Sequence, residues 1–180
     1  AVAEGVTSWQ IVDALKAIDA LSGDIPEVPS EGTLAPDSYE IKIGDLRIDI
    51  LAKMVLAQNE RLVEVWASRD ANTPVKSIEA LLVLASIIEK ETSVSGERFQ
   101  VASVFANRLE QDMPLQTDPS VIYGITMGKG PLGRGLRKSE LRRDTPWNTY
   151  LNKGLPPTAI ANPGVASLQA ALNPAATDYI

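Results

Sequence analysis

The sequence predicts a helix-rich α+β fold with a few short strands, and three observations support this class. Apolar residues recur at helical spacing in most stretches of the chain, which indicates amphipathic helices. Residues 39–43 instead alternate apolar and charged side chains, as a half-buried strand does. The last residues, 177–180, stand where a further apolar strand could begin.

Composition narrows the possible chemistry. The chain has 180 residues, enough for one domain with a real core, and 44% apolar and 22% charged residues are ordinary for a soluble globular protein. A net charge of −6 argues against a general binder of nucleic-acid backbones. With neither Cys nor His, thiol catalysis is excluded and a conventional zinc site nearly so. Acid and base catalysis must therefore fall to Asp, Glu, Tyr or Lys.

Neither a membrane-spanning run nor a signal peptide is recognisable in the sequence. The chain starts at Ala1 without Met and stops at Ile180 near a potential strand. We interpret both ends as cut, so the lack of a targeting signal carries no information about location.

The first half of the chain predicts two helices. Residues 7–10 fit a capping box that opens an amphipathic helix closed by Gly23. An acidic, Pro-rich loop precedes the expected strand at 39–43. A long helix then runs from Gly44-Asp45 to about Arg69.

The second half predicts four more helical segments. Ser77 is the expected N-cap of a helix that reaches about Thr92, and residues 97–111 form the next helix. Asp118 is expected to cap a short helix that Gly124 closes. A last helix begins at residues 162–163 and ends at 173–174.

The helix that ends at Thr92 carries two carboxylates near its end. On a helical wheel Glu91 falls beside Leu84, Ile87 and Ile88, whereas Glu89 points in a very different direction. The two acids therefore cannot form a close dyad. Apolar neighbours would bury Glu91 and raise its pKa, as a proton donor at neutral pH requires. The alternative is that both acids face water at the helix end.

The stretch Ala85-Ser86-Ile87-Ile88-Glu89-Lys90-Glu91-Thr92 resembles the signature of the endolytic murein transglycosylases, the MltG/YceG-like family. The resemblance extends across most of the chain, in the same order as in the family. The matching segments are residues 4–5, 31–39, 97–98, 101–105, 107–109, 113–124, 148–150, 154–157, 160, 162–164 and 173–175. Trp147 stands where the family often has Tyr, a change that keeps an aromatic face.

The resemblance implies a fold, an activity and a catalytic residue. Residues 1–44 would lead into a catalytic domain, residues 45–180, whose C-terminal segment is missing. The family cuts nascent peptidoglycan strands internally, without water, at the bond between N-acetylmuramic acid and N-acetylglucosamine. The products carry 1,6-anhydro-muramic ends, and the cut terminates strand elongation. Glu91 would protonate the glycosidic oxygen and then take the proton of the muramic C6 hydroxyl, with no cofactor or metal.

Six further residues are candidates for binding the glycan. They are Gln116, Thr117, Asp118, Tyr123, Asn148 and Tyr150. Gln116 could hydrogen-bond an acetamido or hydroxyl group, and the tyrosines could stack on sugars, hold Glu91 or belong to the core. Asp118 has the alternative role of an ordinary N-cap. Three residues are candidates for support: Glu89, Asn107 and Asn162.

The Gly-rich segment 128–135 is not a phosphate-binding P-loop, because it lacks the Gly-Lys-Ser/Thr ending and a preceding strand. A solvated loop is the simpler interpretation. Its cations, together with those at 137 and 138, could still meet the carboxylates of peptidoglycan stem peptides.

Two alternatives stay open at this level. A glycan hydrolase could use Asp118 to activate water, and a peptidoglycan-binding module would need no catalytic acid at all. The resemblance further implies work in the bacterial cell envelope, on the periplasmic or outer side of the inner membrane. Peptidoglycan synthases would be the protein partners, no nucleic acid would bind, and a missing N-terminal helix would provide the membrane contact.

Overall fold

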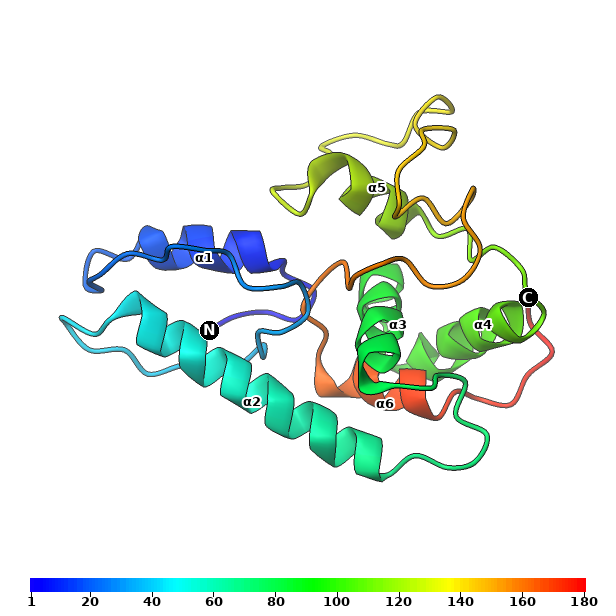
Figure 1. The fold of residues 1–180 in the computed structure, drawn as a ribbon, viewed down its shortest axis with the longest axis horizontal. Helices are drawn as coiled ribbons and strands as arrows, with labels where there is room; N and C mark the ends of the chain where they lie inside the picture. The colour runs from blue at the N-terminus through cyan, green and yellow to red at the C-terminus, as the bar shows by residue number, and fades with distance from the viewer.

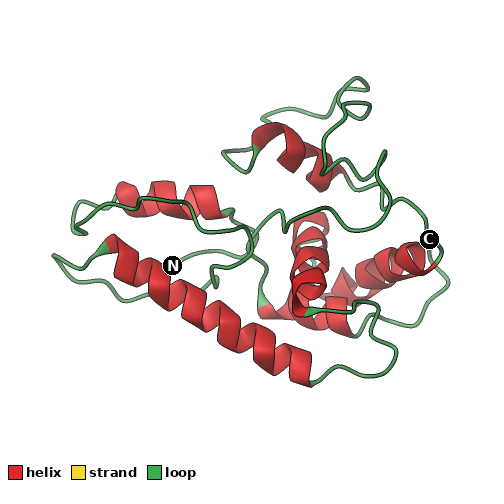
Figure 2. Ribbon diagram, viewed as in Figure 1, coloured by secondary structure: helices red, strands yellow, loops and turns green.

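A computed structural model describes residues 1–180, apart from the side chain of Ser95. The described residues form six α-helices and one short 3₁₀ turn joined by long loops (Figures 1 and 2). The elements are α1 (Ser8–Lys16), α2 (Arg47–Ala67), α3 (Ile78–Glu91), η1 (Ser95–Glu97), α4 (Arg98–Glu110), α5 (Asp118–Thr126) and α6 (Val165–Leu172).

The α+β prediction is wrong, because the described residues contain no sheet. Their only β-type pairing in the structure is an isolated parallel bridge between Ser22 and Leu46. Residues 39–43 alternate as expected but have no strand beside them, and Ile43 is 93% exposed. The alternating pattern alone cannot make a strand, since a strand needs a partner for its backbone groups. The C-terminal residues 177–180 are likewise not a strand.

The main core surrounds α3. Leu81, Leu84, Ile87 and Ile88 of this helix are completely buried, and α6, α4 and the second half of α2 pack around it. Such burial on nearly all sides explains why the sequence of α3 is apolar almost throughout. The prediction of a central buried helix is therefore confirmed, and α3 is the rigid element that carries Glu91.

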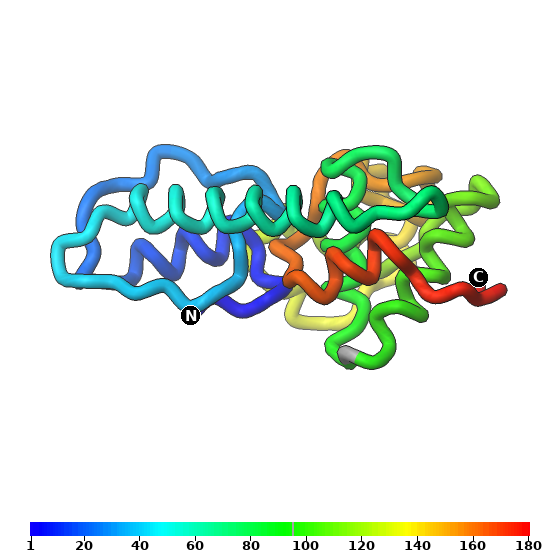
Figure 3. The backbone as a smooth tube through the Cα atoms, turned by 90° about the horizontal axis from the view of Figure 1, so that it is seen from below, coloured from blue at the N-terminus to red at the C-terminus, as the bar shows by residue number. Residues whose placement is uncertain are grey.

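A second apolar cluster joins α1 to the first half of α2. Because α2 is long, Met54 belongs to this cluster while Leu62 and Val65 belong to the core around α3. Figure 3 shows α2 running along the length of the molecule beside both parts. A cavity of about 370 Å³ lies in this second cluster, lined by apolar side chains such as Ile11 and Met54, and Glu91 is not among its lining residues.

The helix ends agree with the sequence in most places. Thr7 and Gln10 form the predicted capping box, and Ser77 accepts a hydrogen bond from the Ala80 amide. The first helix nevertheless ends at Lys16, well before Gly23. The guanidinium of Arg47 donates to the carbonyls of Leu15, Lys16, Ile18 and Gly23, so a remote side chain satisfies the carbonyls that a longer helix would have paired. None of the helices in the described chain is both long and apolar enough to cross a membrane.

Candidate active site

Glu91 is the last residue of α3, and its side chain meets the start of α5. The Thr117 hydroxyl donates a hydrogen bond of 2.9 Å to Oε2 of Glu91. Thr117 is only 2% exposed, whereas Glu91 is exposed. A buried hydroxyl thus orients a carboxyl group that remains open to solvent and to a ligand.

The start of α5 is fixed by the segment 148–150. The Thr117 amide donates to the Thr149 hydroxyl at 3.0 Å, and that hydroxyl lies 2.8 Å from the Ser120 hydroxyl. The Gln116 amide donates to the Thr149 carbonyl at 3.1 Å. Gln116 itself has a positive φ of 53° and an exposed side chain. This backbone geometry holds Thr117 toward Glu91 and leaves the Gln116 carboxamide at the surface.

Asp118 is paired with Tyr150 at the exposed side of this junction. The Tyr150 hydroxyl donates to Oδ1 of Asp118 at 2.7 Å. Partial burial raises the pKa of Tyr150 to about 12, helped by the hydrogen bond to Asp118 and by the negative charges of Asp118 and Glu91. Tyr150 therefore stays protonated at neutral pH and lies within the field of both carboxylates.

The prediction that Asp118 is an N-cap is wrong. The N-cap of α5 is Thr117, and no side-chain capping bond forms there. Asp118 is already helical, and its carboxylate is turned toward Tyr150. Gly124 does not close the helix either, because α5 continues to Thr126 and ends with Met127 in the left-handed conformation.

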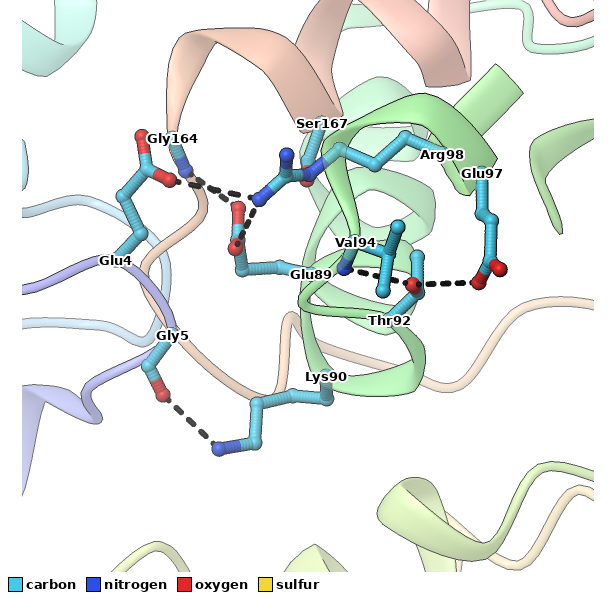
Figure 4. Close-up of polar contacts among 10 residues, drawn as sticks. All are labelled: Glu4, Gly5, Glu89, Lys90, Thr92, Val94, Glu97, Arg98, Gly164 and Ser167. Atoms are coloured by element: carbon cyan, nitrogen blue, oxygen red, sulfur yellow. Dashed lines mark hydrogen bonds and ion pairs between the residues drawn. The ribbon is translucent and has the colours of Figure 1, made fainter. Parts of the chain in front are cut away.

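Glu89 is buried and bound by polar contacts to residues at the starts of two other helices, which Figure 4 draws. Its side chain is 6% exposed; Oε1 lies 3.4 Å from Nη2 of Arg98, and Oε2 accepts from the Gly164 amide at 2.9 Å. Arg98 also donates to the Ser167 hydroxyl at 3.2 Å and lies 3.7 Å from a carboxylate oxygen of Glu4. Glu89 thereby ties the last turn of α3 to the first turns of α4 and α6.

The residues next to Glu91 are anchored as well. Lys90 donates to the Gly5 carbonyl at 3.1 Å, and the Thr92 hydroxyl accepts from the Val94 amide at 3.0 Å (Figure 4). The helix end is therefore held on several sides while the Glu91 carboxyl group projects outward.

The expectation that apolar neighbours bury Glu91 is wrong. Leu84, Ile87 and Ile88 are buried as predicted, but they pack against α2, α4 and α6. Since Glu91 is the last helical residue, no further turn of α3 covers it, and its carboxylate accepts a hydrogen bond from Thr117, the N-cap of α5. The buried carboxylate of the pair is Glu89.

Three predicted Asn residues have structural contacts. Asn148 is fully buried and donates to the Leu141 and Arg143 carbonyls. Asn107 donates to the carbonyls of residues 177 and 179, near the C-terminus of the chain. Asn162 is fully buried, accepts from the Leu34 amide and donates to the Val6 carbonyl. The structure brings together Glu91, Gln116, Thr117, Asp118 and Tyr150, and it places these amides in backbone contacts instead.

Glu31, which is not among the candidates predicted from the sequence, forms a second polar cluster. Its Oε1 accepts from the Ser8 amide at 2.7 Å, and its Oε2 accepts from the Tyr123 hydroxyl at 3.2 Å. Burial raises the pKa of Glu31, although these hydrogen bonds partly oppose the shift. Tyr123 also packs edge-to-face on Trp147. The signal that could have found this cluster is an acid inside a matching segment, residues 31–39, followed by Gly32 and apolar residues.

Glu31 should make stability depend on pH in a defined direction. A carboxyl group whose pKa is raised by folding stabilises the fold below its unfolded pKa, near 4.5, and loses that contribution as pH rises through the folded pKa. We therefore expect the free energy of unfolding of the wild type, relative to Glu31→Gln, to fall between about pH 4 and neutrality. Urea denaturation at several pH values measures this difference. Exposed Glu27→Gln is the control, and a difference from Glu31→Gln that is constant with pH would contradict the assignment.

A metal is not suggested by the arrangement of acids. Within the described part of the chain, no group of three or more Asp or Glu residues is placed to hold a metal ion. Glu91 itself presents a single exposed carboxyl group with a hydroxyl donor beside it, and a second carboxylate, Asp118, is paired with Tyr150.

Comparison with known proteins identifies the family to which the chain belongs. The sequence model of the YceG-like family matches residues 1–180, the whole chain. The chain belongs to the YceG-like family. The predicted resemblance is thereby confirmed.

Other members of the YceG-like family agree in sequence and in fold. The endolytic murein transglycosylase of Bacillus subtilis strain 168 is 42% identical over 152 residues, which cover 84% of this chain and 41% of that protein. The protein of the same name from Streptococcus pneumoniae serotype 2 strain D39 is 29% identical over 155 residues, 83% of this chain and 27% of that protein. A crystal structure of a protein described as YceG-like, from Listeria monocytogenes, has a TM-score of 0.78 and 31% identity, and covers 99% of this chain and 66% of that one.

The chain is shorter than these YceG-like relatives. It spans about two fifths of the Bacillus protein and about a quarter of the Streptococcus protein.

Proposed function

We propose that this protein cleaves the glycan strands of peptidoglycan internally as a lytic transglycosylase, with Glu91 as its acid and base. The observation that carries the proposal is the Glu91 carboxyl group, exposed at the end of a buried helix and oriented by the Thr117 hydroxyl. Membership of the YceG-like family and the names of two relatives support the same reaction.

One carboxyl group is sufficient for this reaction. Protonated Glu91 would give its proton to the oxygen that joins C1 of N-acetylmuramic acid to N-acetylglucosamine, and the C1–oxygen bond would break. The C6 hydroxyl of the same muramic acid would then attack C1 and lose its proton to the Glu91 carboxylate. The proton returns to Glu91, no water is consumed, and one product ends in 1,6-anhydro-N-acetylmuramic acid.

Because Glu91 is exposed, the substrate itself would contribute to keeping this carboxyl group in its protonated form. The fold does not shield this carboxyl group from water, so a glycan strand lying across it would have to do so. Excluding water favours the uncharged form of a carboxyl group, which is the form that donates the proton. Gln116 and Tyr150, at the same junction as Glu91, are the side chains best placed to bind the strand.

The hydrolase alternative depends on Asp118. In a hydrolase this carboxylate would have to deprotonate water, yet its Oδ1 accepts a hydrogen bond from the Tyr150 hydroxyl at 2.7 Å, which stabilises the charged form and makes it a weaker base. This pairing favours the transglycosylase, in which Asp118 positions Tyr150 at the edge of the site. A binding module without catalysis would have no need for an acid that a buried Thr orients.

The proposed substrate fixes the place of action. An enzyme that cuts nascent glycan strands works in the bacterial cell envelope, on the outer side of the inner membrane, next to the synthases that make the strands. A synthase partner and membrane anchoring through a helix outside residues 1–180 are parts of this proposal that rest on the family resemblance alone.

The test is the chemical nature of the new end. Uncrosslinked glycan strands are digested in water labelled with heavy oxygen, using residues 1–180 and a longer form extended at both ends. We expect internal fragments with anhydro-muramic ends and no heavy oxygen, read by mass spectrometry. Reducing ends that contain one heavy oxygen would establish the hydrolase instead. No cleavage by either form would overturn the assignment as an enzyme.

A further inference from the structure

The loop between α5 and residue 145 concentrates positive charge in an acidic protein. We call residues 129–144 the cationic arm. It holds six of the 17 basic residues but only two acids, Glu140 and Asp144, in a chain with a net charge of −6. All six basic side chains are exposed: Lys129, Arg134, Arg137, Lys138, Arg142 and Arg143. The charge of this arm is therefore opposite to that of the molecule as a whole.

Only one of these cations is neutralised by a neighbour in the described structure. Arg134 forms a two-pronged ion pair with Glu140, with bonds of 2.8 and 2.6 Å, and this pairing lowers the pKa of Glu140 to about 2. Glu140 also accepts from the Arg137 amide at 2.8 Å, so its carboxylate shapes the turn. Among the described contacts, the other five basic side chains have no ion pair or hydrogen bond, which leaves them available to an external anion.

One end of the arm is bound at the edge of the candidate active site, and the other end follows helix α5. It begins three residues after Thr126, the last residue of α5, and Figure 1 shows it as the yellow-to-gold loop next to α5. At its other end, Asn148 donates to the Leu141 carbonyl at 3.1 Å and the Arg143 carbonyl at 2.8 Å. The same Asn148 accepts from the amide of Tyr150, whose hydroxyl meets Asp118. The buried amide of Asn148 therefore fixes the arm to the edge of the site.

We propose that the cationic arm binds the carboxylates of the stem peptides on the glycan strand. This inference rests on the proposed function, because the stem peptide is attached to the muramic acid on which Glu91 would act. A stem peptide of five extended residues reaches roughly 16–18 Å from its sugar. Helix α5 separates Thr117, the partner of Glu91, from the start of the arm, and its nine residues span about 14 Å. A peptide on a sugar at Glu91 is therefore long enough to bring its carboxylates to the arm. Arg pairs with carboxylates through two parallel hydrogen bonds, which suits Arg137, Arg142 and Arg143 to this ligand.

The arm should act mainly through long-range attraction. Its side chains are exposed, so each ion pair with a peptide contributes little and is weakened by salt. Together they would enrich peptide-bearing strands near Glu91 and distinguish them from strands stripped of peptides. The predicted specificity is therefore a difference in binding and not in the chemical step.

The test compares two substrates on a protein that does not turn over. Fluorescent glycan strands, with stem peptides or stripped of them by an amidase, are titrated with the Glu91→Gln form. We expect the added substitutions Arg137→Gln and Lys138→Gln to weaken binding of peptide-bearing strands roughly 3- to 10-fold and to leave stripped strands unaffected. The difference should vanish in high salt. The matched control, Lys53→Gln with Lys76→Gln, removes two exposed charges elsewhere and should change neither affinity.

Each other result overturns the inference. Equal weakening of binding to both kinds of strand would mean that the arm contacts the sugar chain or is needed for folding. Unchanged affinity would mean that the arm faces solvent and contacts neither the peptide nor the sugar. Failure of the proposed function is recognised separately, since it appears as the absence of cleavage by unsubstituted protein. The binding comparison decides the role of the arm in either case.

Discussion

Replacing Glu91 by Gln will abolish glycan cleavage while leaving the protein folded. General acid–base catalysis by one side chain contributes about 10²- to 10⁴-fold, and Glu91 would supply both the acid and the base. We therefore expect the cleavage rate to fall by at least that factor. The Gln oxygen can still accept the Thr117 hydrogen bond, and the side chain is exposed, so the melting temperature should stay close to the wild-type value. Release of anhydro-muramic ends measures the first effect and thermal unfolding the second.

Asp118→Asn is the matched control for this prediction. In the transglycosylase, Asp118 only positions Tyr150, so the variant should keep most of its activity. In a hydrolase it would remove the base and cost as much as Glu91→Gln. A Glu91→Gln protein that still cleaves at a rate near that of the wild type would exclude Glu91 as the catalytic residue.

Replacing Glu89 by Ala, in contrast to Glu91→Gln, should destabilise the fold. Arg98, with a side chain only 10% exposed, would lose its closest carboxylate, and the Gly164 amide would lose its acceptor. Breaking a buried ion pair by removing one partner typically costs about 3–5 kcal/mol. We expect a loss near the lower figure, because Glu4 remains 3.7 Å from Arg98. Chemical denaturation measures the change in the free energy of unfolding.

Glu64→Ala provides the reference for Glu89. It removes the same charge from an exposed position on α2 and should change stability by less than about 0.5 kcal/mol. If Glu89→Ala were as mild as Glu64→Ala, the polar cluster in Figure 4 would not stabilise the end of α3.

The helices and the order of the motifs could be predicted from the sequence because both depend on local patterns. The capping box at Thr7, the N-cap at Ser77 and the apolar faces of α3 and α4 are contained within a few residues each. The prediction of a strand at residues 39–43 is wrong because strand pairing depends on a second segment, which the local alternating pattern does not describe. Helix α1 ends before the predicted Gly23 because Arg47, remote in sequence, satisfies its last carbonyls.

At the candidate site, too, local geometry could be predicted from the sequence, whereas contacts between remote segments could not. The wheel correctly separated the directions of Glu89 and Glu91, since residues two apart on a helix diverge. It assigned burial to the wrong acid because it treats all turns of a helix as equally surrounded. Arg98 and Gly164 contact the Glu89 carboxylate and help to bury it. The cluster around Glu31 depends on Tyr123, which is 92 residues away in the sequence. The partners in such contacts follow from the tertiary fold, so a local pattern can at most single out the acid and does not name the residues that it meets.

The anchoring of Glu89 has a consequence for how the protein is made. Its hydrogen bond to Gly164 spans 75 residues, and Lys90 reaches back 85 residues to Gly5. Helix α6, which packs extensively on α3, is the last helix of the described chain. A ribosome therefore releases α3 long before its packing partner exists, and contacts that close such long loops form late. Until α6 emerges, the apolar faces of α3 have no complete core, so a nascent chain paused after α4 would expose its most hydrophobic helix to chaperones and to aggregation.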